Sequence, residues 1–238
     1  MSASEKLILA LDVPDFFAAK KIIDELGDEV IFYKIGLEFL MSGDYFRLIS
    51  YLKEKNKKVF CDLKLYDISQ TVGNAVKNLT KYNVDLLTIH SASFDIMRKA
   101  AENKGSMQVI AVTVLTNLDE KDLSQMGFDE KISLQDLVLK KAELSLEAGL
   151  DGVVAAGFEA KILRQNFGED FLIISPGIRL ERLVGDDQKR TCDVQEALIA
   201  GASHLVVGRP ILSAENPKLM AQKFNKLIHE TCSDFQPN

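Results

Sequence analysis

The sequence predicts an α/β fold, a single (β/α)8 barrel of the TIM type that takes up residues 1–238. Short apolar runs rich in β-branched residues alternate with longer amphipathic runs, which is the pattern of repeated βα units. No Pro/Gly/Ser-rich linker divides the chain, and a length of 238 residues is usual for one such barrel. An open doubly wound sheet usually carries a GxGxxG or P-loop motif after a strand, and neither motif occurs.

The expected strands are mostly continuous apolar runs, as in parallel strands that helices cover on the outside. We expect them at Leu7–Val13, Ile31–Gly36, Val59–Leu65, Leu86–His90, Val109–Leu115, Gly152–Gly157, Leu172–Ser175 and Leu205–Gly208.

Two of the intervening helices carry clear end signals. One begins near Asp15 and stops at Gly27, and another begins at Ser133 and stops at Gly149. Asp136, three residues after Ser133, completes a capping-box layout. A weak internal repeat relates 146–154 to 198–207, with a fainter echo at 83–87, and each copy reads as a helix stop followed by a tight turn into a buried strand.

Composition excludes several classes of function. The net charge of −6 and the pI near 5.2 argue against nucleic-acid binding, which needs a basic surface. No run approaches the roughly 18 apolar residues of a membrane span, and the first residues lack a signal-peptide layout. Three widely spaced cysteines, Cys61, Cys192 and Cys232, form no CxxC pair, which is typical of a reduced, cytoplasmic protein without disulfides or zinc.

Charged residues stand where buried strands should be apolar. Asp12 ends the first expected strand, Lys34 lies in the second, and Asp62 and Lys64 end the third. The period of two places Asp62 and Lys64 on one side of the strand, facing the barrel mouth, where barrel enzymes keep their functional residues. Buried ions need partners, so a cluster of ion pairs that only fills the barrel is the alternative. Charges at the ends of three neighbouring strands favour an active site.

A second group of residues is suited to binding a phosphate. Pro176–Arg179 follows the seventh expected strand, and Gly208 and Arg209 follow the eighth. Barrel enzymes often bind phosphate in these two loops, through backbone N–H groups and a nearby cation. Gly208 permits close approach of the backbone, and Arg209 can bind a phosphate through two hydrogen bonds.

The histidines His90, His204 and His229 do not form a ligand set, so a metal is not expected. Glu38 and Asp67 could in principle ligate a hard cation, and that alternative stays open.

Taken together, the segments resemble the orotidine 5′-phosphate decarboxylase family over nearly the whole chain. The most specific element is Asp62-Leu63-Lys64-Leu65-Tyr66-Asp67-Ile68 followed by Thr71, which matches the family's DxKxxDI signature. The segments 9–12 and 207–210, the Pro-Gly-Ile-Arg of 176–179 and Gln188 agree in type and order. One departure is Ser69-Gln70, where the family usually has Pro-Asn; it affects the start of a helix and no reacting group.

The resemblance implies a cofactor-free, homodimeric barrel that converts orotidine 5′-phosphate to UMP and carbon dioxide in pyrimidine synthesis. It implies that Lys34, Asp62 and Lys64 act together with Asp67 of the partner subunit, with Lys64 protonating the ring carbon. It also implies that Asp12 and the partner's Thr71 contact the ribose and that Thr116 contacts the pyrimidine. The phosphate is expected at Arg179, Gln188, Gly208 and Arg209. Ile68 and Pro176 are two further expected substrate contacts.

Two other functions remain open from the sequence. A magnesium-dependent barrel decarboxylase or aldolase for sugar phosphates, such as a keto-gulonate phosphate decarboxylase, shares the Asp-x-Lys-x-x-Asp strand. A non-catalytic nucleotide-binding barrel is the other alternative, although a binder has no need of Lys64 between two carboxylates.

Overall fold

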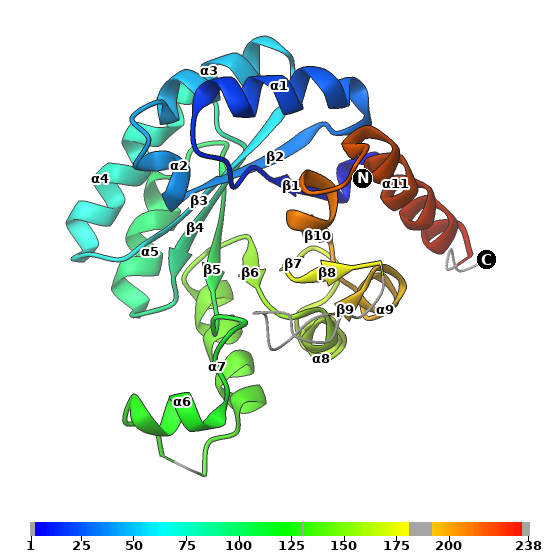
Figure 1. Ribbon diagram of the computed structural model, residues 1–238. Helices are drawn as coiled ribbons and strands as arrows, with labels where there is room; N and C mark the ends of the chain where they lie inside the picture. The colour runs from blue at the N-terminus through cyan, green and yellow to red at the C-terminus, as the bar shows by residue number, and fades with distance from the viewer. Residues whose placement is uncertain (1–2, 130, 181–191, 235–238) are drawn as a thin grey trace.

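A computed structural model describes residues 3–129, 131–180 and 192–234 of the chain. Eight parallel strands close into a barrel in the order β1-β10-β7-β6-β5-β4-β3-β2, which confirms the predicted (β/α)8 fold (Figure 1). The barrel strands are β1 (Leu7–Ala10), β2 (Phe32–Gly36), β3 (Lys58–Leu65), β4 (Leu86–His90), β5 (Gln108–Val112), β6 (Gly152–Val154), β7 (Leu172–Ser175) and β10 (His204–Val207).

Helices surround the barrel on its outside, and α6 stands away from it beyond β5 (Figure 1). None of the helices in the described part of the chain is long and apolar enough to cross a membrane. The helices are α1 (Phe16–Leu26), α2 (Leu37–Leu40), α3 (Tyr45–Glu54), α4 (Ser69–Leu79), α5 (Phe94–Asn103), α6 (Glu120–Gln125), α7 (Leu134–Glu147), α8 (Ala160–Phe167), α9 (Val194–Ile199), α10 (Arg209–Leu212) and α11 (Pro217–Asp234), with short 3-10 turns at Ala3–Glu5, Gly27–Glu29, Thr80–Tyr82 and Gly157–Glu159.

The predicted helix ends are confirmed, with one difference in detail. The Asp15 side chain accepts a hydrogen bond from the Ala18 N–H at 2.9 Å and caps α1. Ser133 caps α7 in the same way, accepting from the Asp136 N–H at 3.1 Å. The Asp136 carboxylate accepts from the Ser133 hydroxyl, whereas a full capping box would use the Ser133 backbone N–H.

The weak internal repeat corresponds to three sharp turns that lead into barrel strands. Asn83, Gly149 and Gly201 have φ angles of 52°, 85° and 99°, in the left-handed region that glycine and asparagine tolerate best. Each turn ends a helical segment and reverses the chain into β4, β6 or β10. The repeat is therefore a repeat of backbone geometry.

Two apolar cores stabilise the barrel. The larger one lies between the strands and the surrounding helices. The smaller one fills the barrel interior and consists of residues from alternating strand positions: Ile8, Ala10, Phe32, Phe60, Leu86, Ile110, Leu172, Ile174 and Val206. Several of these residues also form the floor of the cleft described below, so the inner core supports the site directly.

Several predicted strands extend too far toward the barrel mouth. β1 ends at Ala10, β5 at Val112 and β6 at Val154, each earlier than the sequence indicated. The residues beyond these ends are apolar because they line a cleft or pack under loops, and sequence periodicity alone does not separate that role from a strand. A short parallel pair, β8 (Ile178–Arg179) and β9 (Cys192–Asp193), was also not predicted, because two residues give no periodic signal.

A substitution at Gly152 tests how closely β6 packs against β7 in the barrel wall. A Cβ atom at this position would overlap the carbonyl oxygen of Leu172 on β7, and a backbone atom cannot move away as a flexible side chain can. We expect Gly152→Ala to lower the free energy of unfolding by an amount at or above the upper end of the ~1–3 kcal/mol typical of overpacking. Urea unfolding followed by circular dichroism measures this change.

Gly36→Ala is the matched control for the Gly152 substitution. A Cβ atom there meets only the Lys34 ammonium at 3.5 Å and the Asp62 carbonyl oxygen at 3.7 Å, which are ordinary contacts. Equal stability losses in the two variants would contradict the packing described for β6 and β7.

Candidate active site

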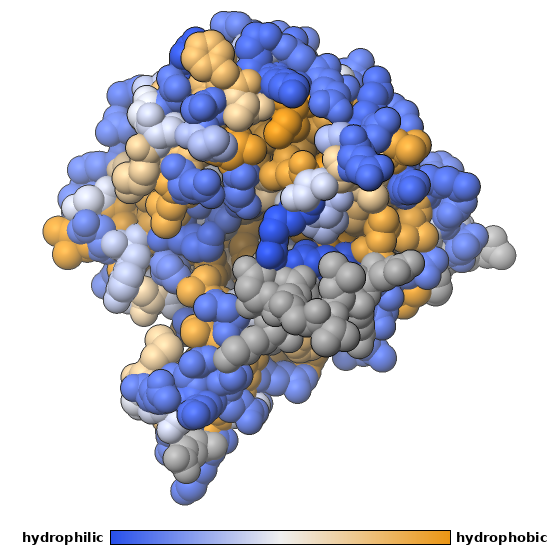
Figure 2. Space-filling view, in the orientation of Figure 1, coloured by the Kyte–Doolittle hydropathy of each residue, from blue (hydrophilic) through white to orange (hydrophobic). Residues whose placement is uncertain are grey.

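A cleft of about 280 Å³ opens at the carboxyl ends of the barrel strands. Figure 2 shows a hollow in this face where hydrophilic and apolar side chains meet. The apolar lining comes from β5, β6, β7, β10 and the loop after β5, and the charged lining comes from β1 to β3 and from the loops after β7 and β10. The charged residues of β2 and β3 and the residue Asp12 form a charged wall, to which Ala10 and Phe60 add apolar surface, while Arg179 and Arg209 add charge on the side of β7 and β10. Apolar surface with a few placed polar groups suits a small organic ligand.

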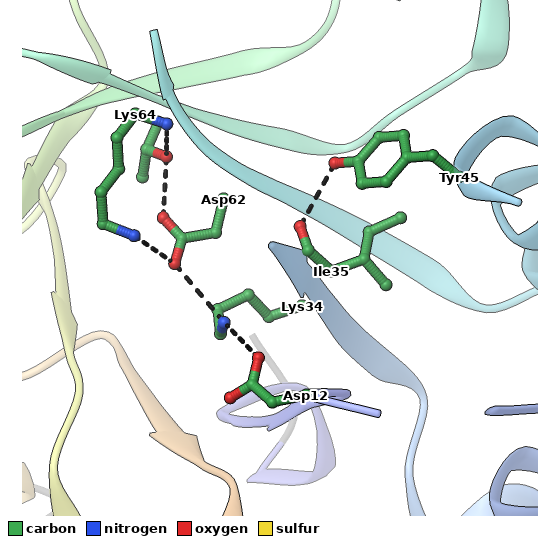
Figure 3. Close-up of polar contacts among 7 residues, drawn as sticks. Asp12, Lys34, Ile35, Tyr45, Asp62 and Lys64 are labelled. Atoms are coloured by element: carbon green, nitrogen blue, oxygen red, sulfur yellow. Dashed lines mark hydrogen bonds and ion pairs between the residues drawn. The ribbon is translucent and has the colours of Figure 1, made fainter. Parts of the chain in front are cut away.

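Four charged side chains form a continuous row on the charged wall (Figure 3). The Lys34 ammonium lies 3.2 Å from Oδ1 of Asp12 and 3.5 Å from Oδ2 of Asp62. The Lys64 ammonium lies 2.8 Å from the same Oδ2 of Asp62. Asp62 thus stands between two lysines, and signs alternate along the row.

Asp62 remains ionised although it is largely buried. Burial by itself would raise the pKa of its carboxyl, but Lys34 and Lys64 outweigh that effect, so the pKa lies below its usual range. A hydrogen bond of 2.8 Å from the Thr88 hydroxyl to Oδ1 of Asp62 acts in the same direction. Lys34 acts through its charge from a side chain that is 12% exposed, and Lys64, which is 29% exposed, acts through both its charge and a direct hydrogen bond.

Sequence periodicity missed Thr88, which lies in β4 and is fully buried. Its hydroxyl contacts both Asp62 and the backbone N–H of Lys64, the latter at 3.0 Å. Threonine is common in strands, so a threonine between Leu87 and Ile89 gives no sign of a polar role.

Two arginines and a glycine line the cleft after β7 and β10. Arg179 on β8 is buried and donates a hydrogen bond to the Ile178 carbonyl at 3.1 Å, while Arg209 at the start of α10 is exposed. A Cβ atom at Gly208 would lie 3.4 Å from the Ala10 side chain and 3.8 Å from Oδ2 of Asp12. The glycine keeps the backbone open where a bound group can approach it.

Comparison with known proteins agrees with this geometry. The sequence model of the family described as "Orotidine 5'-phosphate decarboxylase / HUMPS family" matches residues 5–224. The chain belongs to this family.

Individual relatives cover nearly the whole chain. Proteins named orotidine 5'-phosphate decarboxylase include one from Methylococcus capsulatus, 47% identical over 228 residues, which span 95% of this chain and 93% of the relative. One from Xanthomonas axonopodis pv. citri is 45% identical over 222 residues, 93% of this chain and 90% of the relative. A crystal structure of orotidine 5'-phosphate decarboxylase from Lactobacillus acidophilus superimposes with a TM-score of 0.83 at 30% identity, covering 94% of this chain and 99% of that one.

Most of the residues that the sequence predicted for the site do meet in the cleft. They are Asp12, Lys34, Asp62, Lys64, Thr116, Pro176, Arg179, Gly208 and Arg209. Asp67, Ile68 and Thr71 are exposed and do not line it, and the Asp67 carboxylate accepts a hydrogen bond of 2.6 Å from the Ile68 N–H. Gln188 lies outside the described residues.

The sequence left open a site for a hard cation. Among the residues that the structure describes, no three His, Cys, Asp or Glu side chains converge as a metal site would require. Glu38 is exposed at the start of α2 and does not line the cleft.

Replacing Lys34 tests the electrostatic description of Asp62. In Lys34→Met we expect the pKa of the Asp62 carboxyl to rise, because the more deeply buried of its two cations is gone. NMR titration of ¹³C-labelled aspartate carboxyls measures this pKa. Lys20→Met, which removes an exposed partner of Asp24 on α1, is the control and leaves Asp62 unchanged. An Asp62 pKa that is the same in Lys34→Met and the wild type would show that Lys64 and Thr88 suffice.

Proposed function

We propose that this chain decarboxylates orotidine 5′-phosphate to UMP and carbon dioxide in pyrimidine biosynthesis, as one catalytic barrel domain without a cofactor. The observation that carries the proposal is Asp62 held between Lys34 and Lys64 at the mouth of a barrel, in a cleft that ends at Gly208 and Arg209. The names of the relatives, at 43–47% identity over most of the chain, support the same reaction.

Lys64 is the proposed proton donor. Loss of carbon dioxide leaves negative charge on the ring carbon, and a fixed ammonium group both stabilises that charge and supplies the proton that replaces the carboxylate. Two unit charges ~4 Å apart interact by roughly 4 kcal/mol at an effective dielectric of ~20. Asp62, only 2.8 Å from Lys64, holds the lysine ammonium in place in the cleft.

Asp62 is also proposed to face the carboxylate that the substrate loses. The carboxyl of Asp62 is ionised, so the two negative charges repel one another until carbon dioxide leaves. The positive charge that Lys34 and Lys64 hold in place before the substrate arrives is the larger contribution that we propose.

The phosphate is proposed to bind at Arg179, Gly208, Arg209 and Gln188, with Pro176 and Thr116 against the base and Asp12 at the ribose. Arg179, Gly208 and Arg209 follow β7 and β10, neither of which neighbours β3 in the barrel, so the phosphate is remote from Lys64 and from the bond that breaks. Binding energy gained there can offset the cost of closing loops over the base.

We further propose a homodimer in which Asp67, Ile68 and Thr71 enter the active site of the partner. In support, these residues are exposed just past β3, outside their own cleft. Segments that follow β2, β3 and β4 also expose apolar side chains, as expected of a face that a second subunit covers: Leu37, Met41, Tyr66, Ile68 and Phe94.

A cytoplasmic location completes the proposal. It is supported by the cysteines Cys61, Cys192 and Cys232, none of which forms a disulfide. The acidic net charge of −6 supports a small-molecule substrate, with neither nucleic acid nor a membrane as a partner.

A turnover assay tests the reaction itself. We expect the wild-type protein to consume orotidine 5′-phosphate, followed by ultraviolet absorbance, equally fast with and without a metal chelator. Lys64→Ala should lose at least ~100-fold in turnover, the lower range for general acid catalysis, and still bind UMP by isothermal titration calorimetry. Lys140→Ala, which removes an exposed lysine on α7, is the control. Activity that the chelator abolishes would favour a magnesium-dependent sugar-phosphate enzyme, and UMP binding without turnover would favour a non-catalytic barrel.

Mixed dimers test the shared active site. Lys64→Ala and Asp67→Asn protomers should each be nearly inactive, but in a mixed dimer one site contains both changes and the other contains neither. Random exchange makes about half of the dimers mixed, so activity should return to roughly a quarter of wild type.

The control for the mixed dimers pairs Lys64→Ala with Asp62→Asn. Both residues serve their own subunit in this proposal, so no intact site forms and no activity returns. Recovery in the control pair, or none with Asp67→Asn when tagged subunits prove that mixed dimers are present, would contradict the shared site.

A further inference from the structure

The pairing of β3 with β4 contains an irregularity at the active site. Cys61 pairs with Leu87 and Leu65 pairs with Ile89, so three residues of β3 lie opposite a single residue of β4. The three are Asp62, Leu63 and Lys64, and the one is Thr88. Regular pairing cannot continue here, and the extra length of β3 must bulge out of the sheet.

The bulge places Lys64 in an unusual backbone conformation. Its φ angle is 48°, in the left-handed region that side chains other than glycine and asparagine rarely adopt. Such a conformation persists only where surrounding contacts hold it, and such residues cluster at functional sites. The contact that replaces regular strand pairing is the hydrogen bond of 3.0 Å from the Lys64 N–H to the Thr88 hydroxyl oxygen.

The same hydroxyl group has only one proton to donate, and the geometry determines where it goes. Because the Thr88 oxygen accepts from Lys64, its proton is directed to Oδ1 of Asp62 at 2.8 Å. Oδ1 is thereby occupied, and Oδ2 is the oxygen that both Lys34 and Lys64 contact. Thr88 thus connects the backbone of one charged residue to the side chain of the other.

We propose that Thr88 is a positioning residue, whose hydroxyl fixes the backbone bulge at Lys64 and the orientation of the Asp62 carboxylate together, and so sets where the Lys64 ammonium points. This inference rests on the proposed decarboxylation for its kinetic consequence only. Thr88 itself does not line the cleft. Its effect on the reaction therefore passes through Asp62 and Lys64.

The other groups around Asp62 show how the contribution of Thr88 to the position of this carboxylate differs from that of the lysines. The titratable groups near this carboxylate come from three strands: Lys34 on β2, Lys64 on β3 and His90 on β4, whose pKa burial lowers, with Asp12 on the other side of Lys34. The two lysines, which line the cleft, contact one oxygen of the carboxylate, and the fully buried Thr88 donates to the other. Without Thr88, the lysines alone would determine the rotation of the carboxylate, and Lys64 would lose its backbone partner.

Thr88→Val tests the proposal, because valine keeps the shape of threonine and removes only the hydroxyl. We expect kcat to fall by on the order of 10- to 100-fold, the loss that a misplacement of about 1 Å can cause, while KM changes little. Thr88→Ser keeps the hydroxyl and should restore most of kcat. Thr231→Val on α11 removes another buried threonine hydroxyl, which bonds to the Leu227 carbonyl far from the cleft, and should leave kcat within about 2-fold.

A second measurement does not depend on turnover. In Thr88→Val, ¹³C titration should show a raised pKa for Asp62, and the amide resonance of Lys64 should shift; Thr88→Ser and Thr231→Val should show neither change. If wild-type protein does not decarboxylate orotidine 5′-phosphate, the proposed function fails, and the NMR results still decide the role of Thr88. An Asp62 pKa and Lys64 amide unchanged in Thr88→Val, or a Thr88→Ser variant as impaired as Thr88→Val, would overturn the proposal.

Discussion

The carboxylate of Asp62 between two ammonium groups is the interaction on which the site depends. A single ion at this depth would be strongly unfavourable, and here each charge makes the burial of its neighbour tolerable. Lys34 and Lys64 share one oxygen of Asp62, and Asp12 partners Lys34 from the outer side. Removing one member therefore leaves a neighbouring charge without its partner, so the row acts as a unit.

In the barrel, the apolar core that stabilises the fold lies below the charged side chains that line the cleft. The inner apolar core ends at residues such as Phe60 and Ile174, which also form part of the cleft lining. Beyond these residues, toward the carboxyl ends of the strands, charged side chains face the cleft and no further apolar layer follows. The energy of folding comes mainly from apolar burial below and around the site, which lets the mouth carry closely spaced charges at an acceptable cost.

The fold and most of the site were predictable because they depend on patterns that sequence displays directly. Alternating βα units indicate the barrel, and charges in otherwise apolar strand ends indicate Asp12, Lys34, Asp62 and Lys64. Regular alternation along β3 predicted that Lys64 faces the cleft, which the structure confirms. However, β3 is not regular there, because the strand bulges and Lys64 has a φ angle of 48°. Thr88 could not be predicted, because its role depends on the register between two strands, and register comes from the packed barrel.

The central claim is that Lys64 meets the ring carbon while the phosphate binds at the other end of the cleft. A crystal structure with UMP bound measures this most directly. We predict the Lys64 ammonium within about 3–3.5 Å of the ring carbon that bore the carboxylate, the separation expected of reacting groups, with the phosphate against Gly208 and Arg209. A pyrimidine ring bound away from Lys64, or a phosphate bound beside Lys64 and away from Gly208 and Arg209, would contradict this arrangement.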